Sequence, residues 1–141
     1  MKYTVAVFAV LFNERHEFLA LKFADDHFGG KWTLPAGRLE QHETWKAGLL
    51  REIREETGLD ERQVTIRDPI FVDTWTVGDE PFLGVMFWGT VATTRVVLSH
   101  EHAEFKWLHS DQCSSIDPAY TTYQEIVTAA YTRLQQSKEE T

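Results

Sequence analysis

The apolar side chains of this chain fall into separate runs, and the spacing within each run predicts its secondary structure. Segments rich in β-branched and aromatic residues predict strands, and they lie near residues 3–12, 17–23, 64–77, 82–93 and 103–108. A shorter apolar stretch at 32–34 predicts a short strand that runs into a tight loop. Two further segments show apolar residues at helical spacing, one after Thr44 and one after Pro118.

The two predicted helices differ in how clearly their ends are marked. The first is bounded by Thr44, a residue type that caps helix N-termini, and by Gly58, which suits the left-handed position after a helix. Its apolar stripe comprises Trp45, Leu49, Leu50 and Ile53. The stripe of the second helix comprises Tyr123, Ile126, Val127, Ala130, Tyr131 and Leu134. The tail from Ser137 to Thr141 is expected to fray.

The order of these segments predicts the fold class. Strands and helices alternate irregularly, which favours an α/β (α+β) fold with a mixed β-sheet between helices over a doubly wound parallel sheet. The chain has 141 residues, without a Pro/Gly/Ser-rich linker or an internal repeat. We therefore expect a single domain over residues 1–141, with a hydrophobic core of its own.

Charge, cysteine content and the length of the apolar segments limit the partners and the location that we expect for this protein. The formal net charge of −8 argues against a nucleic-acid polymer, since no basic stripe is present to release counterions. A single cysteine, Cys113, cannot form an internal disulfide, which suits the cytoplasm. The apolar run at 3–12 passes into Asn13 without a small-residue cleavage site, so we expect a buried strand and not a signal peptide. No segment is long enough to span a membrane.

The segment from Gly37 to Leu59 carries the candidate chemistry. Glu52, Glu55 and Glu56 fall on one face of the first helix, because residues three and four apart are neighbours there. Such crowded carboxylates repel one another unless cations neutralise them. Hard divalent ions such as Mg²⁺ prefer oxygen ligands of this kind, so the cluster predicts a metal site.

Neighbouring residues have more than one candidate role. Arg51 lies one turn before Glu55, and its guanidinium is suited to hold a carboxylate in place or to touch a phosphate; we favour the first. Glu43 is suited to bind free N–H groups at the helix start, to contribute a metal ligand, or to act only on the helix dipole. The loop before the helix offers backbone carbonyls, and that of Ala36 is a further candidate ligand.

This segment matches the Nudix box, so the chain resembles a Nudix hydrolase. The match holds at every fixed position of the motif, namely Gly37, Glu43, Arg51, Glu52, Ile53, Glu55, Glu56, Gly58 and Leu59. The strand and loop at 32–37 and the segment 101–107 also look like their family counterparts. The family often has glycine at position 36 and alanine at position 48, whereas this chain has Ala36 and Gly48, the latter costing about 1 kcal/mol of helix stability.

The resemblance implies a fold, a reaction and a set of roles. It implies an α/β/α sandwich and hydrolysis of a nucleoside diphosphate linked to another moiety, by water attack on phosphorus with Mg²⁺ (Mn²⁺ as a substitute). It assigns Glu52 and Glu56 as principal metal ligands, Glu55 as a ligand or close neighbour, Arg51 as the orienting group and the carbonyl of Ala36 as a further ligand.

The general base is expected on a carboxylate, but its identity stays open at this stage. Glu52, Glu101 and Glu104 are the candidates, with Glu101 ranked ahead of Glu104 because its spacing to Trp107 looks like the family pattern. A mobile loop around residue 101 is suited to deliver a base after substrate binds. His100 and His102 flank this position, but without a third soft ligand nearby they do not favour a zinc site.

Residues outside the motif are expected to select the substrate, a small phosphorylated nucleotide. Aromatic candidates for stacking a base are Phe28, Trp75, Phe82 and Trp88, and most of these are expected to belong to the core. Trp75 is the main candidate, since some diadenosine polyphosphate hydrolases of the family carry an aromatic residue about that far past the box. Glu104 is a further candidate contact.

Two rival interpretations remain. One is a sensor module that binds a nucleotide or metabolite without turnover, against which the complete set of box carboxylates argues. The other is an isoprenoid diphosphate isomerase, which needs a catalytic cysteine, whereas Cys113 lies late in a polar turn. A homodimer is expected only by analogy with relatives.

Overall fold

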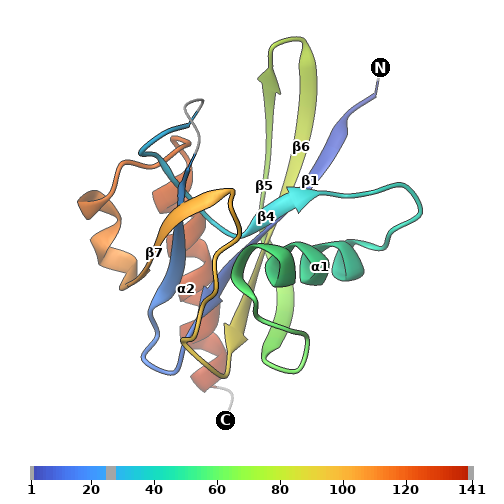
Figure 1. Cartoon of the computed structure of the whole chain (residues 1–141). Coiled ribbons are helices and arrows are strands. Elements are labelled where there is room, and N and C mark those ends of the chain that lie inside the picture. Colours follow the sequence, from blue (N-terminus) through green and yellow to red (C-terminus); the bar gives the residue numbers. More distant parts are fainter. Residues whose placement is uncertain (1, 25–27, 140–141) are drawn as a thin grey trace.

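The computed structural model describes residues 2–24 and 28–139, and its core is one mixed sheet between two helices (Figure 1). The strands are β1 (Thr4–Phe12), β2 (Phe18–Phe23), β3 (Trp32–Thr33), β4 (Ala36–Arg38), β5 (Val64–Val77), β6 (Glu80–Val91) and β7 (His102–Leu108). The helices are α1 (Trp45–Thr57), the 3₁₀ helix η1 (Ser110–Ser115) and α2 (Tyr123–Glu139).

The sheet has seven strands, with the main path β3-β2-β1-β6-β5. Strand β4 pairs with β1, and β7 pairs with β2. The pairing of β1 with β6 is parallel and the other pairings are antiparallel. The prediction of an α/β (α+β) fold with a mixed sheet is therefore confirmed.

Each face of the sheet is covered by one helix. Strand β1 is central, and its apolar run alternates between the faces, with Val7 in the cluster that contains Ile53 of α1 and Phe8 in the cluster that contains Ile126 of α2. A strand buried on both faces reads as a continuous apolar segment, which is why residues 3–12 resemble a signal peptide in sequence. The layers form the expected α/β/α sandwich.

Helix α1 begins and ends where the sequence predicts. The side chain of Thr44 accepts a hydrogen bond from the Ala47 N–H at 3.2 Å, and Gly58 has a φ of 76°. The Gly58 N–H donates to the Arg54 carbonyl at 2.9 Å. These local interactions fix the helix boundaries without help from the rest of the chain.

Three details differ from the predictions. Strand β4 occupies residues expected to form only a tight loop, because Ala36 and Gly37 pair with Phe8 and Val7 of β1. The 3₁₀ helix η1 has no counterpart among the predicted elements. Helix α2 extends to Glu139, beyond Ser137, from which the tail is expected to fray, and residues 140 and 141 lie outside the described part.

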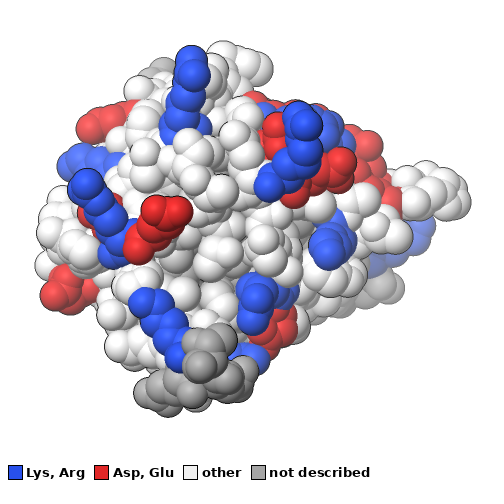
Figure 2. Space-filling model, turned by 90° about the horizontal axis from the view of Figure 1, so that it is seen from below, with Lys and Arg blue, Asp and Glu red and all other residues white. Residues whose placement is uncertain are grey.

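Two observations concern the nucleic-acid and membrane partners that the sequence argues against. On the face shown in Figure 2, the described Lys and Arg side chains are scattered among uncharged and acidic residues, without a continuous basic stripe. Among the described residues, neither α1 nor α2 combines the length and apolar character needed to cross a bilayer.

Candidate active site

The site forms where β4 lies against the polar edge of α1. The side chain of Glu52 packs directly on the backbone of Gly37, and a Cβ atom at position 37 would overlap the Glu52 carboxyl group. Glycine is therefore needed here for Glu52 to keep this place, because of space and not because of backbone conformation. This contact explains why the box begins with glycine fifteen residues before a glutamate.

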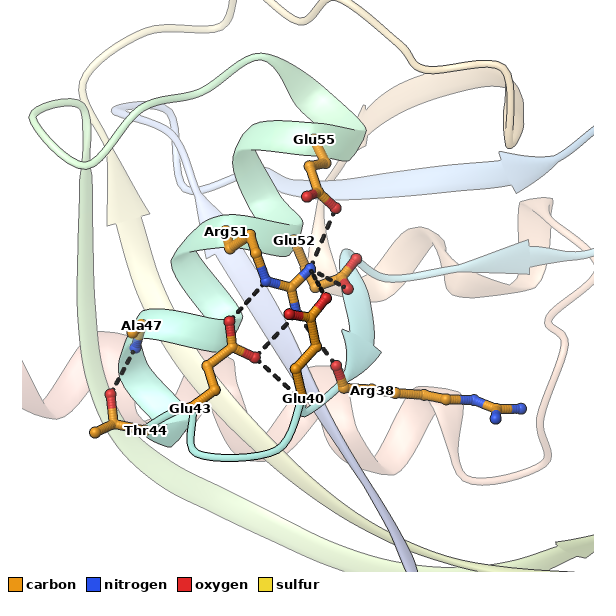
Figure 3. Close-up of polar contacts among 8 residues, drawn as sticks. All are labelled: Arg38, Glu40, Glu43, Thr44, Ala47, Arg51, Glu52 and Glu55. Atoms are coloured by element: carbon orange, nitrogen blue, oxygen red, sulfur yellow. Dashed lines mark hydrogen bonds and ion pairs between the residues drawn. The ribbon is translucent and has the colours of Figure 1, made fainter.

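Arg51 lies at the centre of a group of carboxylates (Figure 3). Its Nε and Nη2 atoms donate to the two carboxylate oxygens of Glu43 at 2.7 and 3.0 Å. Its Nη1 atom donates to Glu52 at 2.8 Å and to Glu55 at 3.3 Å, and lies 3.7 Å from Glu40. The hydrogen bond with Glu43, followed by the contacts with Glu52, holds the pKa of Arg51 well above its usual range. Arg51 is thus a permanent cation in a fixed place.

Glu43 binds Arg51 and not the N–H groups of the helix. Its carboxylate also accepts a hydrogen bond from the Glu40 N–H at 3.0 Å. The bond from Arg51, then that from Glu40, lowers the pKa of Glu43 to about 2. Gly48 makes room for this arrangement, because a Cβ atom there would lie 2.7 Å from a Glu43 oxygen and 2.5 Å from Leu39 Cδ2. The structure favours a role for Glu43 that is not among the three expected from the sequence, namely an anchor for Arg51.

Glu56 is the most buried of the box carboxylates, with 5% of its surface exposed. Its side chain accepts a hydrogen bond from the Ala36 N–H at 2.9 Å. Burial raises the pKa of Glu56 to about 9 against the opposing effect of that hydrogen bond, and the charges of Glu52, Glu101 and Glu55 raise it further. An acid group in this position favours a compensating cation.

Glu101 reaches the same site from a different element. It lies in the turn that precedes β7, where the Ser99 N–H donates to the Glu56 carbonyl at 3.4 Å and the Glu101 N–H donates to the Ser99 hydroxyl at 3.3 Å. The charge of Glu101 contributes to the raised pKa values of both Glu52 and Glu56, after the larger effect of burial. The structure therefore brings Glu101 toward the box.

Glu104 is placed differently. It lies on β7 opposite Lys22 of β2, and the two side chains form an ion pair at 3.8 Å. Glu104 thus lies next to a cation on the sheet, whereas the charge of Glu101 acts on Glu52 and Glu56.

The aromatic candidates divide into core and surface residues. Trp88 is buried and donates to Asp68 at 2.9 Å, and Phe82 is buried as well, so neither is exposed for stacking a base. Trp75 is half-buried, stacks on Phe82 with centroids 5.3 Å apart, and lies edge-on to Phe8 at 5.9 Å. Phe28 is 45% exposed. Most of the aromatic candidates thus pack into the core, as expected.

The residues considered for an isomerase and for a zinc site have other contacts in the structure. Cys113 is buried in η1, where its Sγ atom donates to the Ser110 carbonyl at 3.7 Å. His102 is buried and stacks on Phe23 at 5.6 Å. Neither position favours the isomerase or a zinc centre.

The donor set nevertheless suits a divalent cation. Among the described residues, no group of three or more His, Cys, Asp or Glu side chains is already arranged to hold a metal. In Figure 3, Glu52 and Glu55 both contact the guanidinium of Arg51. Carboxylates are the hard oxygen donors that Mg²⁺ prefers, and Glu56 is buried next to them without an ion-pair partner among the described residues.

The sequence alone did not indicate every member of this site. Glu40, in the β4–α1 loop, and the carbonyl of Arg38, at the end of β4, both join the Arg51 group, and the Arg38 carbonyl accepts from Arg51 Nη2 at 3.3 Å. Their only sequence signal is proximity to Glu43, which is too general to identify them.

Comparisons with known proteins agree with this geometry. Residues 2–130 match the family model described as NUDIX domain. The 8-oxo-dGTP diphosphatase of Proteus vulgaris is 36% identical over 72 residues, which are 51% of this chain and 64% of that protein. The 8-oxo-dGDP phosphatase NUDT18 of Danio rerio is 43% identical over 58 residues, which are 41% of this chain and 18% of that protein.

The likeness extends to a solved structure. The MutT protein from Methanosarcina mazei Go1 has a TM-score of 0.79 and 26% identity, over 94% of this chain and 95% of that one. The chain spans 64% of the length of the Proteus relative and 18% of that of the Danio relative. Since the family match covers nearly all of the sequence, this chain belongs to the NUDIX domain family.

Proposed function

We propose that the protein is a Mg²⁺-dependent hydrolase that cleaves a diphosphate bond in a nucleoside diphosphate linked to another moiety. The observation that carries this proposal is the gathering of Glu52, Glu55, Glu56 and Glu101 around the β4–α1 contact. The names of the relatives, a diphosphatase and a phosphatase of oxidised guanine nucleotides, support this reaction class.

Glu52, Glu55, Glu56 and the carbonyl of Ala36 would hold the metal. When bound, a divalent ion neutralises phosphate oxygens and lowers the pKa of bound water; Mn²⁺ is an expected substitute. Two of these carboxylates, Glu52 and Glu55, now contact Arg51. Arg51 is also held by both oxygens of Glu43, an anchor that would remain if Glu52 and Glu55 held a metal.

The chain's own residues handle the proton. The oxygen of water forms a bond to phosphorus, the anhydride P–O bond breaks, and its electron pair leaves with the departing phosphate oxygen. The proton of the attacking water passes to a carboxylate, for which Glu101 is the preferred base and Glu52 the alternative. Glu101 is preferred because Glu52 is already engaged by Arg51 at 2.8 Å.

Release of phosphate products tests the proposal. The purified protein with Mg²⁺ is given nucleoside triphosphates, including the 8-oxo form of dGTP, nucleotide sugars, ADP-ribose and dinucleoside polyphosphates. We expect selective turnover, and we expect Glu56→Gln to lower it more than about a hundred-fold, as loss of a charged group that stabilises the transition state does. The glutamine oxygen can still accept from the Ala36 N–H, so the melting temperature should change little.

Two results would reject the proposal. Loss of activity that only follows loss of thermal stability in Glu56→Gln would remove its direct role. Tight nucleotide binding without turnover by the wild-type protein would favour the sensor interpretation. The single domain over residues 1–141, the cytoplasmic location and the homodimer also stay predictions, to be tested by limited proteolysis, localisation and solution mass.

A further inference from the structure

We propose that Ser99 is a positioning residue for the hydrolysis reaction, because it connects the backbone of Glu56 to that of Glu101 and so fixes the base relative to the metal-binding carboxylates. The inference rests on the proposed function, in which Glu56 holds the metal and Glu101 is the preferred base. Ser99 lies outside the box, in the segment between β6 and β7. Its backbone N–H group and its side-chain hydroxyl each make one of the two connections.

The backbone of Ser99 is attached to the C-terminal end of α1. The last carbonyls of a helix have no partner within the helix, and two of them accept hydrogen bonds from the segment after β6. The Thr57 carbonyl accepts from the Val97 N–H at 2.8 Å, and the Glu56 carbonyl accepts from the Ser99 N–H at 3.4 Å. The side chain of Glu56 in turn accepts from the Ala36 N–H of β4 at 2.9 Å. Ser99 is therefore bonded to a residue whose side chain lies in the site.

The side chain of Ser99 stabilises the turn that carries Glu101. Its hydroxyl accepts from the Glu101 N–H at 3.3 Å, and its carbonyl accepts from the His102 N–H at 3.4 Å. Serine stabilises tight turns in this way, by accepting from the N–H group two residues further along the chain. On the other side of the turn, the Ala24 N–H of the segment after β2 donates to the Glu101 carbonyl at 3.0 Å. The backbone of Glu101 is thus held at both its N–H and its carbonyl.

The turn brings the charge of Glu101 close to the box. Burial is the main cause of the raised pKa values of Glu52 and Glu56, and the charge of Glu101 contributes to both. A general base must lie within hydrogen-bond reach of the proton that it accepts. The side chain of Glu101 is exposed, so the neighbouring side chains restrict it little and its position depends on its backbone. Without the Ser99 hydroxyl, the carboxylate should spend less time in the productive geometry.

A double-mutant cycle tests this inference. With Mg²⁺, kcat and KM are measured for Ser99→Ala, Glu101→Gln and the double variant, on each nucleotide that the wild-type protein hydrolyses. We expect Ser99→Ala to lower kcat about ten-fold, as when a group that supports a metal-site residue is lost, with KM near the wild-type value. In the Glu101→Gln background the same substitution should have no further effect, because Ser99 acts through Glu101. An equal loss in both backgrounds would overturn the inference.

Matched variants separate the hydroxyl from the fold. Ser99→Thr keeps a hydroxyl acceptor and should restore most of the lost kcat. Thr93→Ala removes the same kind of hydrogen bond from the same connection, where the Thr93 hydroxyl accepts from the Arg95 N–H at 3.2 Å, and should leave kcat unchanged. Ser99→Ala keeps the backbone N–H that binds Glu56, so its melting temperature should stay near that of the wild type. Failure of Ser99→Thr to restore kcat, or an equal loss in Thr93→Ala, would contradict a positioning role.

A measurement that does not depend on turnover keeps this inference separate from the proposed function. If the wild-type protein hydrolyses no anhydride substrate, the proposed function fails, and amide hydrogen exchange read by NMR then decides whether Ser99 holds Glu101. Loss of one hydrogen bond should speed exchange at the Glu101 amide about ten-fold in Ser99→Ala but not in Thr93→Ala. Unchanged exchange at Glu101 in Ser99→Ala would show that the hydroxyl does not hold the turn.

Discussion

The two helices cover opposite faces of one sheet, but they meet it with different chemistry. Helix α2 meets its face with side chains that are buried and mostly apolar, namely Tyr123, Ile126, Val127, Ala130 and Leu134. Helix α1 buries Leu49 and Ile53 in the same way, and in addition presses Glu52 and Glu56 against β4. The layer formed by α2 is therefore mostly apolar where it meets the sheet, whereas the layer formed by α1 also has a charged edge.

The difference separates stability from activity. Apolar burial on α2 stabilises the fold in proportion to the area removed from water. A buried carboxylate such as Glu56, whose pKa rises to about 9 chiefly through burial, costs stability unless a cation joins it. Features that oppose local rules of stability are expected at functional sites. Changes on the α1 edge should thus reduce activity more than stability, and changes on α2 should do the reverse.

The largest expected effect is on the α1 side, at Gly37. In Gly37→Ala the new methyl group overlaps the Glu52 carboxyl group, so Glu52 must leave its place over β4. We expect kcat to fall by roughly a hundred- to a thousand-fold, as when one preorganised polar group is lost. The melting temperature should change little, because the displaced side chain can move toward solvent. Steady-state kinetics and thermal denaturation check both parts.

A glycine far from the site provides the control for Gly37. Gly78, with a φ of 61°, lies in the turn between β5 and β6, and asparagine tolerates that conformation. Gly78→Asn should retain kcat. If Gly37→Ala also retained kcat, the packing of Glu52 on β4 would have no role in catalysis.

The reverse outcome is expected on the α2 side. Ile126 is fully buried, and Ile126→Ala should lower the free energy of unfolding by about 2–5 kcal/mol through lost burial and a cavity. Activity per folded molecule should stay near the wild-type value. Urea denaturation measures the first quantity and kinetics at low temperature the second. A loss of kcat in the folded variant would contradict the idea that residues on α2 determine stability and residues on the α1 edge determine activity.

The sequence predicts the α1 side well where the determinants are local. Thr44 and Gly58 bound the helix through contacts within a few residues, and the box motif fixes which side chains share its edge. It does not predict β4, because a strand of three residues has no periodicity and exists only through its pairing with β1. The partners of Arg51 in the loop, such as Glu40, depend on that same long-range placement.

The exposure of aromatic side chains is also hard to predict from the sequence. Of the four aromatic candidates Phe28, Trp75, Phe82 and Trp88, only Phe28 is exposed. Trp75 packs so closely on the next strand that a Cβ atom at Gly84 would lie 2.5 Å from its ring. Which aromatic side chain faces solvent depends on register and on the neighbouring strand, neither of which the composition of a segment encodes.

A smaller loss of activity is expected when Arg51, which contacts the carboxylates of the charged edge, is replaced. In Arg51→Lys the planar guanidinium is replaced by a point charge that cannot bind both oxygens of Glu43 and also reach Glu52. We expect kcat to fall about ten-fold, within the range seen when groups supporting metal ligands are changed, and the melting temperature to fall by several degrees. Arg62→Lys, whose exposed side chain lies 3.8 Å from Asp60, should have neither effect. Wild-type kinetics in Arg51→Lys would show that charge alone is sufficient.

The smallest expected effect is at Cys113, which lies on the apolar α2 side of the sheet. Burial, followed by the charge of Asp111, raises the pKa of this thiol from 9.0 to about 11. Since the folded pKa exceeds the unfolded one, the stabilising contribution is fully present below about pH 9 and is lost as the pH rises toward about 11. Urea denaturation over this range should therefore show a steeper fall in the free energy of unfolding for the wild-type protein than for Cys113→Ala. The buried tyrosines titrate in both proteins, so the difference isolates the thiol, and parallel pH profiles would show that Cys113 ionises as freely in the folded chain as in the unfolded one.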